Sequence, residues 1–382
     1  MTLNYDLEAL IMQVFRPRRG ERVLLLNDYP SDSTGLQAAE KMDYDKRREM
    51  VRTWHNALIN LATQHGFTVE GIITYEPTGG HGADLPRAAV QVVSKIDLQH
   101  KLHSLTERDI VIAITRFSPT APLFSLIEKE GKRFRAATMP GAWIDMRAFE
   151  ADYEAVKQKA RILAREITAA THATVTFSYN RKDYVCTFDL RGRKGKADDG
   201  VCRRPKQRIN FPSGEAFAAA YEGDHRGLYN RHILGQSRTK GEIPVLFGET
   251  LVVYHVENGR IIEVVGTSEK ANEMRDFFDA DPARRFIAEF AGGCNDRAED
   301  SESVLESEKR EGFHWAYGLN RHFYRGRIRP QFFKFKPVHN DVVYGKGGPI
   351  KVKIELFYEA GPPKVIMRDT QYLPEVLGEV FR

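Results

Sequence analysis

The first 115 residues alternate between short apolar runs and a long amphipathic segment, and this alternation constrains the fold most. The runs "RVLLLND" (22–28) and "DIVIAIT" (109–115) are of the buried-strand type. Between them, residues 46–65 have helical periodicity and stop at Gly66, and "TVEGIITYE" (68–76) indicates a further strand. Alternating strands and helices predict an open α/β sheet with parallel strands.

A helical segment at about 146–169 is expected to end this N-terminal α/β domain, which we place at residues 1–168. The sequence pattern then changes to an alternation of apolar and polar residues with a period of two. Residues 172–192 predict one β-hairpin, and residues 248–266 predict a second, with Asn258-Gly259 as a turn of the primed type.

Helices are predicted around Ser268 to Asp279 and from near Asp281 onward. Residues 169–382 therefore predict an α+β C-terminal domain that is rich in antiparallel strands. This second domain also carries the candidate chemistry.

Composition places few limits on partners. The net charge is +5, from 57 basic and 52 acidic residues among 382, and this excess is too small to argue for nucleic acid or a membrane surface. Three cysteines without a CxxC pair argue against a disulfide framework and a thiolate zinc site. No apolar run approaches the roughly 18 residues of a membrane span, and the first residues do not resemble a signal peptide. We therefore expect a cytoplasmic protein.

Potential metal ligands recur in four stretches of the second domain. His339 and Asp341 are two residues apart in a segment of strand-like alternation, so their side chains share one face. Glu215 follows a Pro-Ser-Gly turn, and Glu289 precedes a glycine pair. Glu308 and His314 both lie in "ESEKREGFHWAYGLN" (306–320).

Carboxylates with imidazoles suit Zn²⁺, Mn²⁺, Co²⁺ or Fe²⁺. Six such residues exceed the three that a single catalytic zinc takes from the protein. Two ions about 3.5–4 Å apart need more ligands, including a carboxylate that bridges them, and such a pair activates water for amide hydrolysis. The ligand types thus point to a two-metal centre, although each residue alone would be unremarkable on a protein surface.

The sequences around these residues resemble a known family. "NFPSGEAF", "IAEFAGGCN", "ESEKREGFHWAYG" and "VHNDVVYG", with "MPGAWIDMRAFEADYEAV" upstream, are similar to the motifs of the M29 metallo-aminopeptidases of the aminopeptidase T type. The resemblance covers roughly residues 130–358. It implies a cytoplasmic homodimer with an α/β N-terminal domain, two divalent ions (Zn, Co or Mn) in the C-terminal domain, and removal of N-terminal residues from peptides.

The resemblance also implies roles for individual residues. Glu215 would bind one ion, Glu289 would bridge both, and Glu308 would be a ligand or the general base. His314, His339 and Asp341 match the remaining ligands.

Two features depart from the family pattern. Arg321 stands where members carry a tyrosine, for which Tyr317 or Tyr324 are the candidate substitutes at the substrate rim. The segment Glu222–Phe247 is longer than the corresponding family loop, and we interpret it as a surface excursion, a lid or an arm that reaches a partner subunit.

Two alternatives stay open beside the hydrolase. His314, His339 and Asp341 would also form the facial triad of a mononuclear Fe(II) dioxygenase of the 2,5-dihydroxypyridine type, with Arg321 near an anionic aromatic substrate. A non-catalytic binding protein is the other alternative. Glu215 and Glu289, which a mononuclear iron site does not need, favour the hydrolase acting on a peptide or another small molecule.

Overall fold

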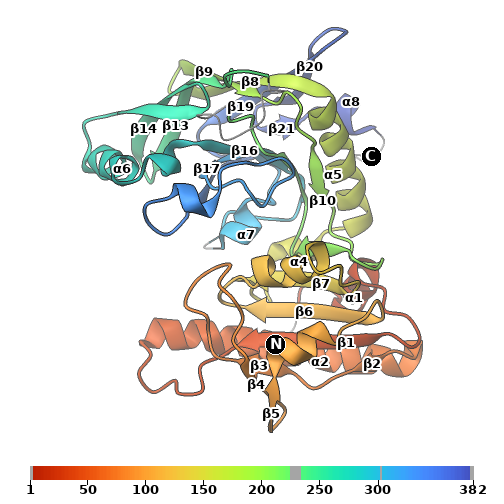
Figure 1. The fold of residues 1–382 in the computed structure, drawn as a ribbon. Helices are drawn as coiled ribbons and strands as arrows, with labels where there is room; N and C mark the ends of the chain where they lie inside the picture. Colours follow the sequence, from red (N-terminus) through yellow and green to blue (C-terminus); the bar gives the residue numbers. More distant parts are fainter. Residues whose placement is uncertain (1–2, 224–233, 302, 379–382) are drawn as a thin grey trace. The chain divides into compact units, whose positions relative to one another are not determined.

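The computed structural model describes residues 3–223, 234–301 and 303–378 (Figure 1). The chain divides into two compact units, each assembled from three stretches. The N-terminal unit comprises Met1–Lys157, Asp198–Ser213 and Asn295–Ser307, and the C-terminal unit comprises Gln158–Ala197, Gly214–Cys294 and Glu308–Arg382.

The N-terminal unit is built on an eight-stranded sheet in the order β11-β7-β6-β1-β3-β4-β5, with β2 beside β1. The central strands β1 (Arg22–Asp28), β3 (Ile73–Tyr75), β6 (Asp109–Thr115), β7 (Arg135–Pro140) and β11 (Arg208–Asn210) pair in parallel. The predicted open α/β sheet is thus confirmed. An antiparallel edge hairpin of β4 (Ala88–Gln91) and β5 (Ser94–Asp97) was not expected.

Helix α2 (Ala38–His65) follows β1 and packs its apolar stripe on the sheet, with Trp54 fully buried. It begins eight residues before the predicted start and ends at Gly66, whose φ of 72° is the left-handed geometry typical of a helix stop. The predicted strand 68–76 is broken into β2 (Thr68–Val69) and β3. Shorter helices complete the unit: α1 (Leu7–Val14), α3 (Leu98–His103), α4 (Thr120–Glu128) and α7 (Val304–Ser307).

The helical segment predicted at 146–169 forms a short 3-10 turn η1 (Arg147–Glu150) and then α5 (Tyr153–Ala169). The chain first passes from one unit to the other at Lys157, within α5. The predicted boundary after residue 168 falls near the end of the same helix.

Two sheets form the C-terminal unit. The eight-stranded sheet is entirely antiparallel. Its strands, in spatial order, are β15 (Arg260–Val265), β14 (Thr250–Glu257), β13 (Lys240–Phe247), β9 (Lys182–Asp189), β8 (Ala170–Tyr179), β19 (Lys351–Tyr358), β20 (Lys364–Arg368) and β21 (Gln371–Tyr372). The five-stranded sheet has the order β10 (Lys196–Asp198), β12 (Glu215–Ala218), β16 (Ile287–Gly293), β17 (Gly312–Gly318) and β18 (His339–Gly345).

Aromatic side chains join these two sheets face to face. Phe177 and Phe188 of the larger sheet lie 5.9 and 5.7 Å, centroid to centroid, from Phe313 of the smaller sheet. All three rings are fully buried. The antiparallel, sheet-rich C-terminal fold that was predicted is confirmed.

Local predictions in this unit met mixed outcomes. Asn258 and Gly259 have φ values of 50° and 74°, as a primed hairpin turn requires. Helix α6 (Glu269–Ala280) begins after Ser268, whose hydroxyl accepts from the Ala271 N–H. The helix predicted from Asp281 is wrong, since only the 3-10 turn η2 (Pro282–Arg285) forms there. The remaining short elements are η3 (Pro330–Phe332) and α8 (Pro374–Leu377).

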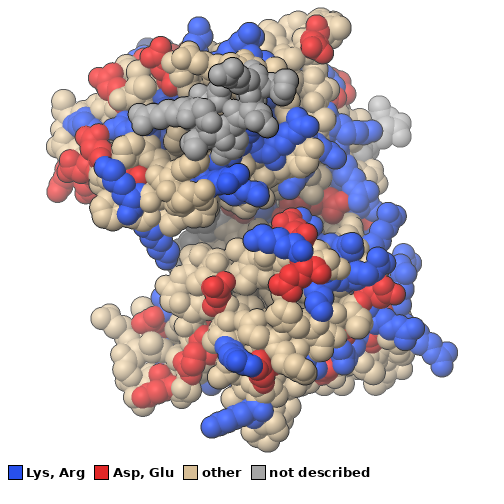
Figure 2. All heavy atoms as spheres, in the orientation of Figure 1, with Lys and Arg blue, Asp and Glu red and all other residues tan. Residues whose placement is uncertain are grey.

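The long segment Glu222–Phe247 is only in part a loop, because its last eight residues form β13. Residues 224–233 lie outside the described residues, so the proposed lid or arm stays a prediction. No helix among the described residues is long and apolar enough to cross a membrane. Basic and acidic side chains are interspersed on the face shown in Figure 2, in keeping with the nearly balanced charge.

Candidate metal centre

Five of the six predicted ligands lie on one face of the five-stranded sheet. In an antiparallel sheet, residues directly opposite each other point to the same face. Ala316 of β17 pairs with Glu289 on one side and with Asp341 on the other, so these three share a face. His314, two residues before Ala316, shares it too.

The same argument extends the face to its edges. Glu215 of β12 pairs with Gly293, which pairs with Gly312 of β17. His339 pairs with Gly318 and precedes Asp341 by two residues. Small residues between the ligands leave room on this face, whereas the opposite face carries the large core side chains.

The glycine pair of "EFAGGCND" has a steric reason. A Cβ added to Gly293 would lie 2.1 Å from the carbonyl oxygen of Arg310 and 2.6 Å from that of Glu308. The stretch from Glu308 to Arg310 therefore passes directly against β16. This close approach, which only glycine permits, brings Glu308 toward the ligand face.

The ligand atoms form two groups that share one residue. Atoms of Glu215, Glu289 and His314 lie within 4.8 Å of one another, as do atoms of Glu289, His339 and Asp341. His314 Nε2 is 3.2 Å from a Glu215 oxygen. His339 Nε2 is 3.0 Å from a Glu289 oxygen and 3.4 Å from an Asp341 oxygen. Glu289 is thus placed between the two groups.

Each histidine has one nitrogen turned toward the carboxylates. The Nδ1 atom of His339 hydrogen-bonds the Leu319 carbonyl at 2.7 Å, which orients its Nε2 toward Glu289 and Asp341. The Nδ1 atom of His314 is buried and has no hydrogen-bond partner among the described residues. A backbone carbonyl at one ring nitrogen and carboxylates at the other are the usual surroundings of a metal-binding imidazole, and His339 has both.

The carboxylates are crowded and poorly solvated. Burial, together with the nearby Glu215 and Asp341, raises the pKa of Glu308 to about 8 against the opposing effect of Lys309. Burial likewise raises the pKa of Glu289, partly offset by its hydrogen bond to His339. Although burial lowers it, the pKa of His314 rises to about 9 because of Glu215. Buried carboxylates of this number require positive charge nearby, so the residues fit a divalent cation.

One positive charge at the site escaped sequence reasoning. Lys309 is completely buried, and its Nζ lies 2.6 Å from Glu215 and 2.8 Å from Glu308. Glu308, predicted as a ligand or base, belongs to neither ligand group and faces this ammonium. Lys309 directly follows Glu308 in the sequence, but a lysine beside a glutamate gives no signal of burial.

The residues predicted at the substrate rim lie in different surroundings. Tyr317 points to the core face, where its ring packs 5.2 Å from Phe278, so it does not line the ligand face as proposed. Tyr324 is 44% exposed and stacks with Arg325. Arg321 is exposed. His322 was not predicted as a site residue, although its ring centroid lies 4.8 Å from that of His339.

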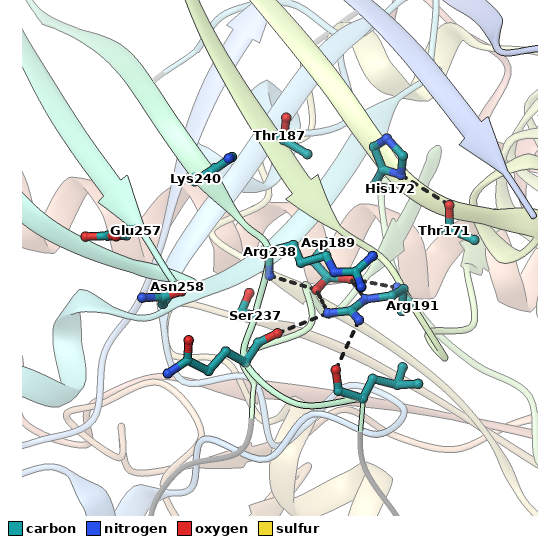
Figure 3. Close-up of a pocket in the computed structure, with 12 residues that line it drawn as sticks. Thr171, His172, Thr187, Asp189, Arg191, Ser237, Arg238, Lys240, Glu257 and Asn258 are labelled. Carbon is teal, nitrogen blue, oxygen red and sulfur yellow. Dashed lines mark hydrogen bonds and ion pairs between the residues drawn. The ribbon is translucent and has the colours of Figure 1, made fainter.

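The pocket in Figure 3 is separate from these ligands. It has a volume of about 660 Å³ and is lined by residues of β8, β9, β13 and β14 and the segments beside them. Within it, the Asp189 carboxylate accepts hydrogen bonds from the Arg191 side chain and the Arg238 N–H. Arg191 also donates to the carbonyls of Leu234 and Gln236. These contacts tie the end of the long segment to the sheet.

Comparison with known proteins supports the fold. No protein-family model and no curated protein matches the sequence. Among solved structures, 2,5-dihydroxypyridine dioxygenase from Pseudomonas putida KT2440 is similar over 100% of both chains, with a TM-score of 0.62 and 16% identity. Wild-type AmpT from Thermus thermophilus is similar over 96% of this chain and 98% of its own, with a TM-score of 0.55 and 14% identity. Both likenesses show a shared two-part fold.

Proposed function

We propose that the protein is a divalent-metal-dependent hydrolase with two ions per chain. The observation that carries this proposal is the position of Glu289, which belongs to both ligand groups. A mononuclear site has no need of a carboxylate between two sets of ligands, whereas a two-metal site requires one.

The charges of the site are compatible with two ions per chain. Glu215, Glu289, Glu308 and Asp341 supply four negative charges when ionised, and Lys309 supplies one positive charge. Two divalent ions and one bound hydroxide would neutralise this set. One divalent ion would leave one net negative charge in a buried place when all four carboxylates are ionised, but none when Glu308, whose pKa is about 8, is protonated.

We assign a separate role in catalysis to each of these residues. Glu215 and His314 would hold one ion, His339 and Asp341 the other, with Glu289 between them. Bound ions of this kind lower the pKa of water and polarise a carbonyl. The Glu308 carboxyl, whose pKa is raised by burial and by the neighbouring Glu215 and Asp341, would pass a proton to the leaving amine. Lys309 would keep Glu308 oriented.

Peptides are the substrate that we propose, with cleavage after the first residue. The four motifs around the ligands support this choice, since they are similar to those of the M29 metallo-aminopeptidases. The fold likeness to AmpT is compatible with it. A cytoplasmic homodimer stays a prediction from the same resemblance.

The second candidate is a mononuclear Fe(II) dioxygenase. The fold likeness to 2,5-dihydroxypyridine dioxygenase favours it. Against it, the three residues of the supposed triad are divided between the two groups: His314 with Glu215 and Glu289, His339 and Asp341 with Glu289. Glu215 and Glu289 would also have no role in such a site.

Elemental analysis of natively purified protein, combined with two assays, tests the proposal. We expect about two equivalents of zinc, cobalt or manganese per chain and release of p-nitroaniline from amino-acid p-nitroanilides. One equivalent of iron, with oxygen uptake on dihydroxypyridines, would establish the dioxygenase instead. Protein without metal, with a thermal stability that chelators do not change, would indicate a binding protein.

A further inference from the structure

Three side chains beside the metal centre form what we call the aromatic wall: Phe217, His322 and Phe323. The ring of Phe323 lies 5.4 Å from that of His339 and 4.1 Å from that of His322. His322 meets His339 nearly at a right angle, at 84°. Two of the three rings therefore contact a predicted metal ligand directly.

The third ring connects the wall to the other ligand group. Phe217 lies two residues after Glu215 on β12, so both side chains point to the ligand face. Its ring is 5.2 Å from that of Phe323. The wall thus runs along the ligand face from Glu215 to His339.

Exposure distinguishes this wall from the hydrophobic core. The core rings on the opposite face of the sheet, such as Phe290 and Phe313, are at most 1% exposed. Phe217 and Phe323 are only half-buried, and His322 is exposed as a residue, although protein groups surround its imidazole closely enough for burial to lower its pKa. Nor do the imidazole nitrogens of His322 hydrogen-bond any described residue. Rings that merely filled a core would be covered, so these remain available to a ligand.

We propose that the aromatic wall is the side-chain subsite of the metal centre and selects substrates with an aromatic or large apolar residue next to the scissile amide. This inference rests on the proposed hydrolytic function. A carbonyl held at the ligand face would place its substituent along the wall. Ring contacts at 4.5–7 Å strengthen binding by several-fold to about tenfold, and they favour flat groups over a methyl group.

The test uses the full-length, metal-loaded protein and L-phenylalanine, L-leucine and L-alanine p-nitroanilides. We expect kcat/KM for phenylalanine to exceed that for alanine by about tenfold, mainly through KM. Phe323→Leu and His322→Ala should each lower this ratio about threefold or more.

A matched control is available on the other sheet. His172 and Phe357 also stack, with centroids 4.4 Å apart, but they lie on β8 and β19, which carry no predicted ligand. Phe357→Leu should leave the phenylalanine preference unchanged. A preference that falls as much in Phe357→Leu as in Phe323→Leu would overturn the proposal.

Two further readouts separate the wall from the hydrolytic function. Calorimetric titration with L-phenylalaninol and L-alaninol measures side-chain recognition without hydrolysis, and metal content is measured for every variant. Hydrolysis of all three substrates at equal rates would overturn the wall and leave the function standing. Without hydrolysis, tighter binding of phenylalaninol that Phe323→Leu abolishes would uphold the wall and reject the function. Variants that lose metal would show that the rings only support His339, which also overturns the proposal.

Discussion

Glu289 is the residue on which the two ligand groups depend. Replacing it with glutamine keeps its shape but removes the charge and one strong acceptor. We expect Glu289→Gln to reduce metal content below one ion per chain and kcat/KM by at least about a thousandfold, since both ions lose a ligand. Glu215→Gln should lose only one ion. The exposed Glu263→Gln serves as a control that should retain both. Equal metal content in all three variants would contradict the assignment.

Lys309 is a cation that sequence reasoning missed, and its effect on stability should depend on metal. Removing one partner of a buried charge pair costs about 3 kcal/mol. We expect Lys309→Met to lose stability of this order in the metal-free protein, because Glu215 and Glu308 are left uncompensated. Added metal should reduce the loss, since divalent ions neutralise the same carboxylates.

Urea unfolding with and without zinc measures this difference. Lys346→Met is the matched control, since Lys346 pairs with Glu311 at 3.0 Å but is half exposed. An exposed pair of this kind contributes less than about 1 kcal/mol. An identical loss for Lys309→Met in both conditions would show that the ammonium acts independently of the metals.

Asp28 gives the N-terminal unit a pH dependence of its own. It ends β1, is 1% exposed, and accepts the N–H groups of Arg116 and Phe117. Burial raises its pKa to about 6 despite these bonds. The folded state therefore holds a proton that the unfolded state has released between about pH 4 and pH 6, so its contribution to stability falls as pH rises through that window.

The shift corresponds to about 3 kcal/mol between the two ends of the window. Asp28→Asn cannot ionise and should lack this slope. The difference in unfolding free energy between wild type and Asp28→Asn, measured at pH 4 and pH 7.5, isolates the effect from other carboxylates. Parallel pH profiles for the two proteins would rule it out.

At the scale of elements, the contact between β16 and the stretch before β17 is what positions Glu308. Gly293→Ala would place a methyl group 2.1 Å from the Arg310 carbonyl, so the backbone must move. We expect a loss of about 2 kcal/mol in stability and weaker metal binding. Gly35→Ala, where no atom lies within 4 Å of the added Cβ, is the control. Unchanged metal affinity in Gly293→Ala would show that this contact does not shape the site.

Local patterns predicted strands and helices well where a regular stripe of apolar residues faces the core. Strands β1 and β6 match their predicted bounds, and α2 stops at Gly66 as expected. The pattern failed at β3, where Gly71 interrupts the run, and after Asp281, where the turn η2 ends at Arg285 and the buried strand β16 begins at Ile287. Single-segment periodicity does not register such interruptions.

The candidate site shows a similar division. The motif flanks predicted Glu215, Glu289, His314, His339 and Asp341 as ligands, and the sheet register brings all five to one face. The direction of Tyr317 follows from strand alternation, since it lies three residues after His314 and therefore on the opposite face. The burial of Lys309 and the approach of His322 to His339 depend on how distant segments pack. No spacing within one segment encodes them.

At the scale of the whole molecule, the central claim is that the C-terminal unit closes its ligands around two ions joined by Glu289. Anomalous diffraction from crystals of zinc-loaded protein tests it most directly. The account predicts two peaks about 3.5–4 Å apart, one beside His314 and one beside His339, with Glu289 touching both. A single peak bound by His314, His339 and Asp341, with Glu215 and Glu289 uninvolved, would contradict it.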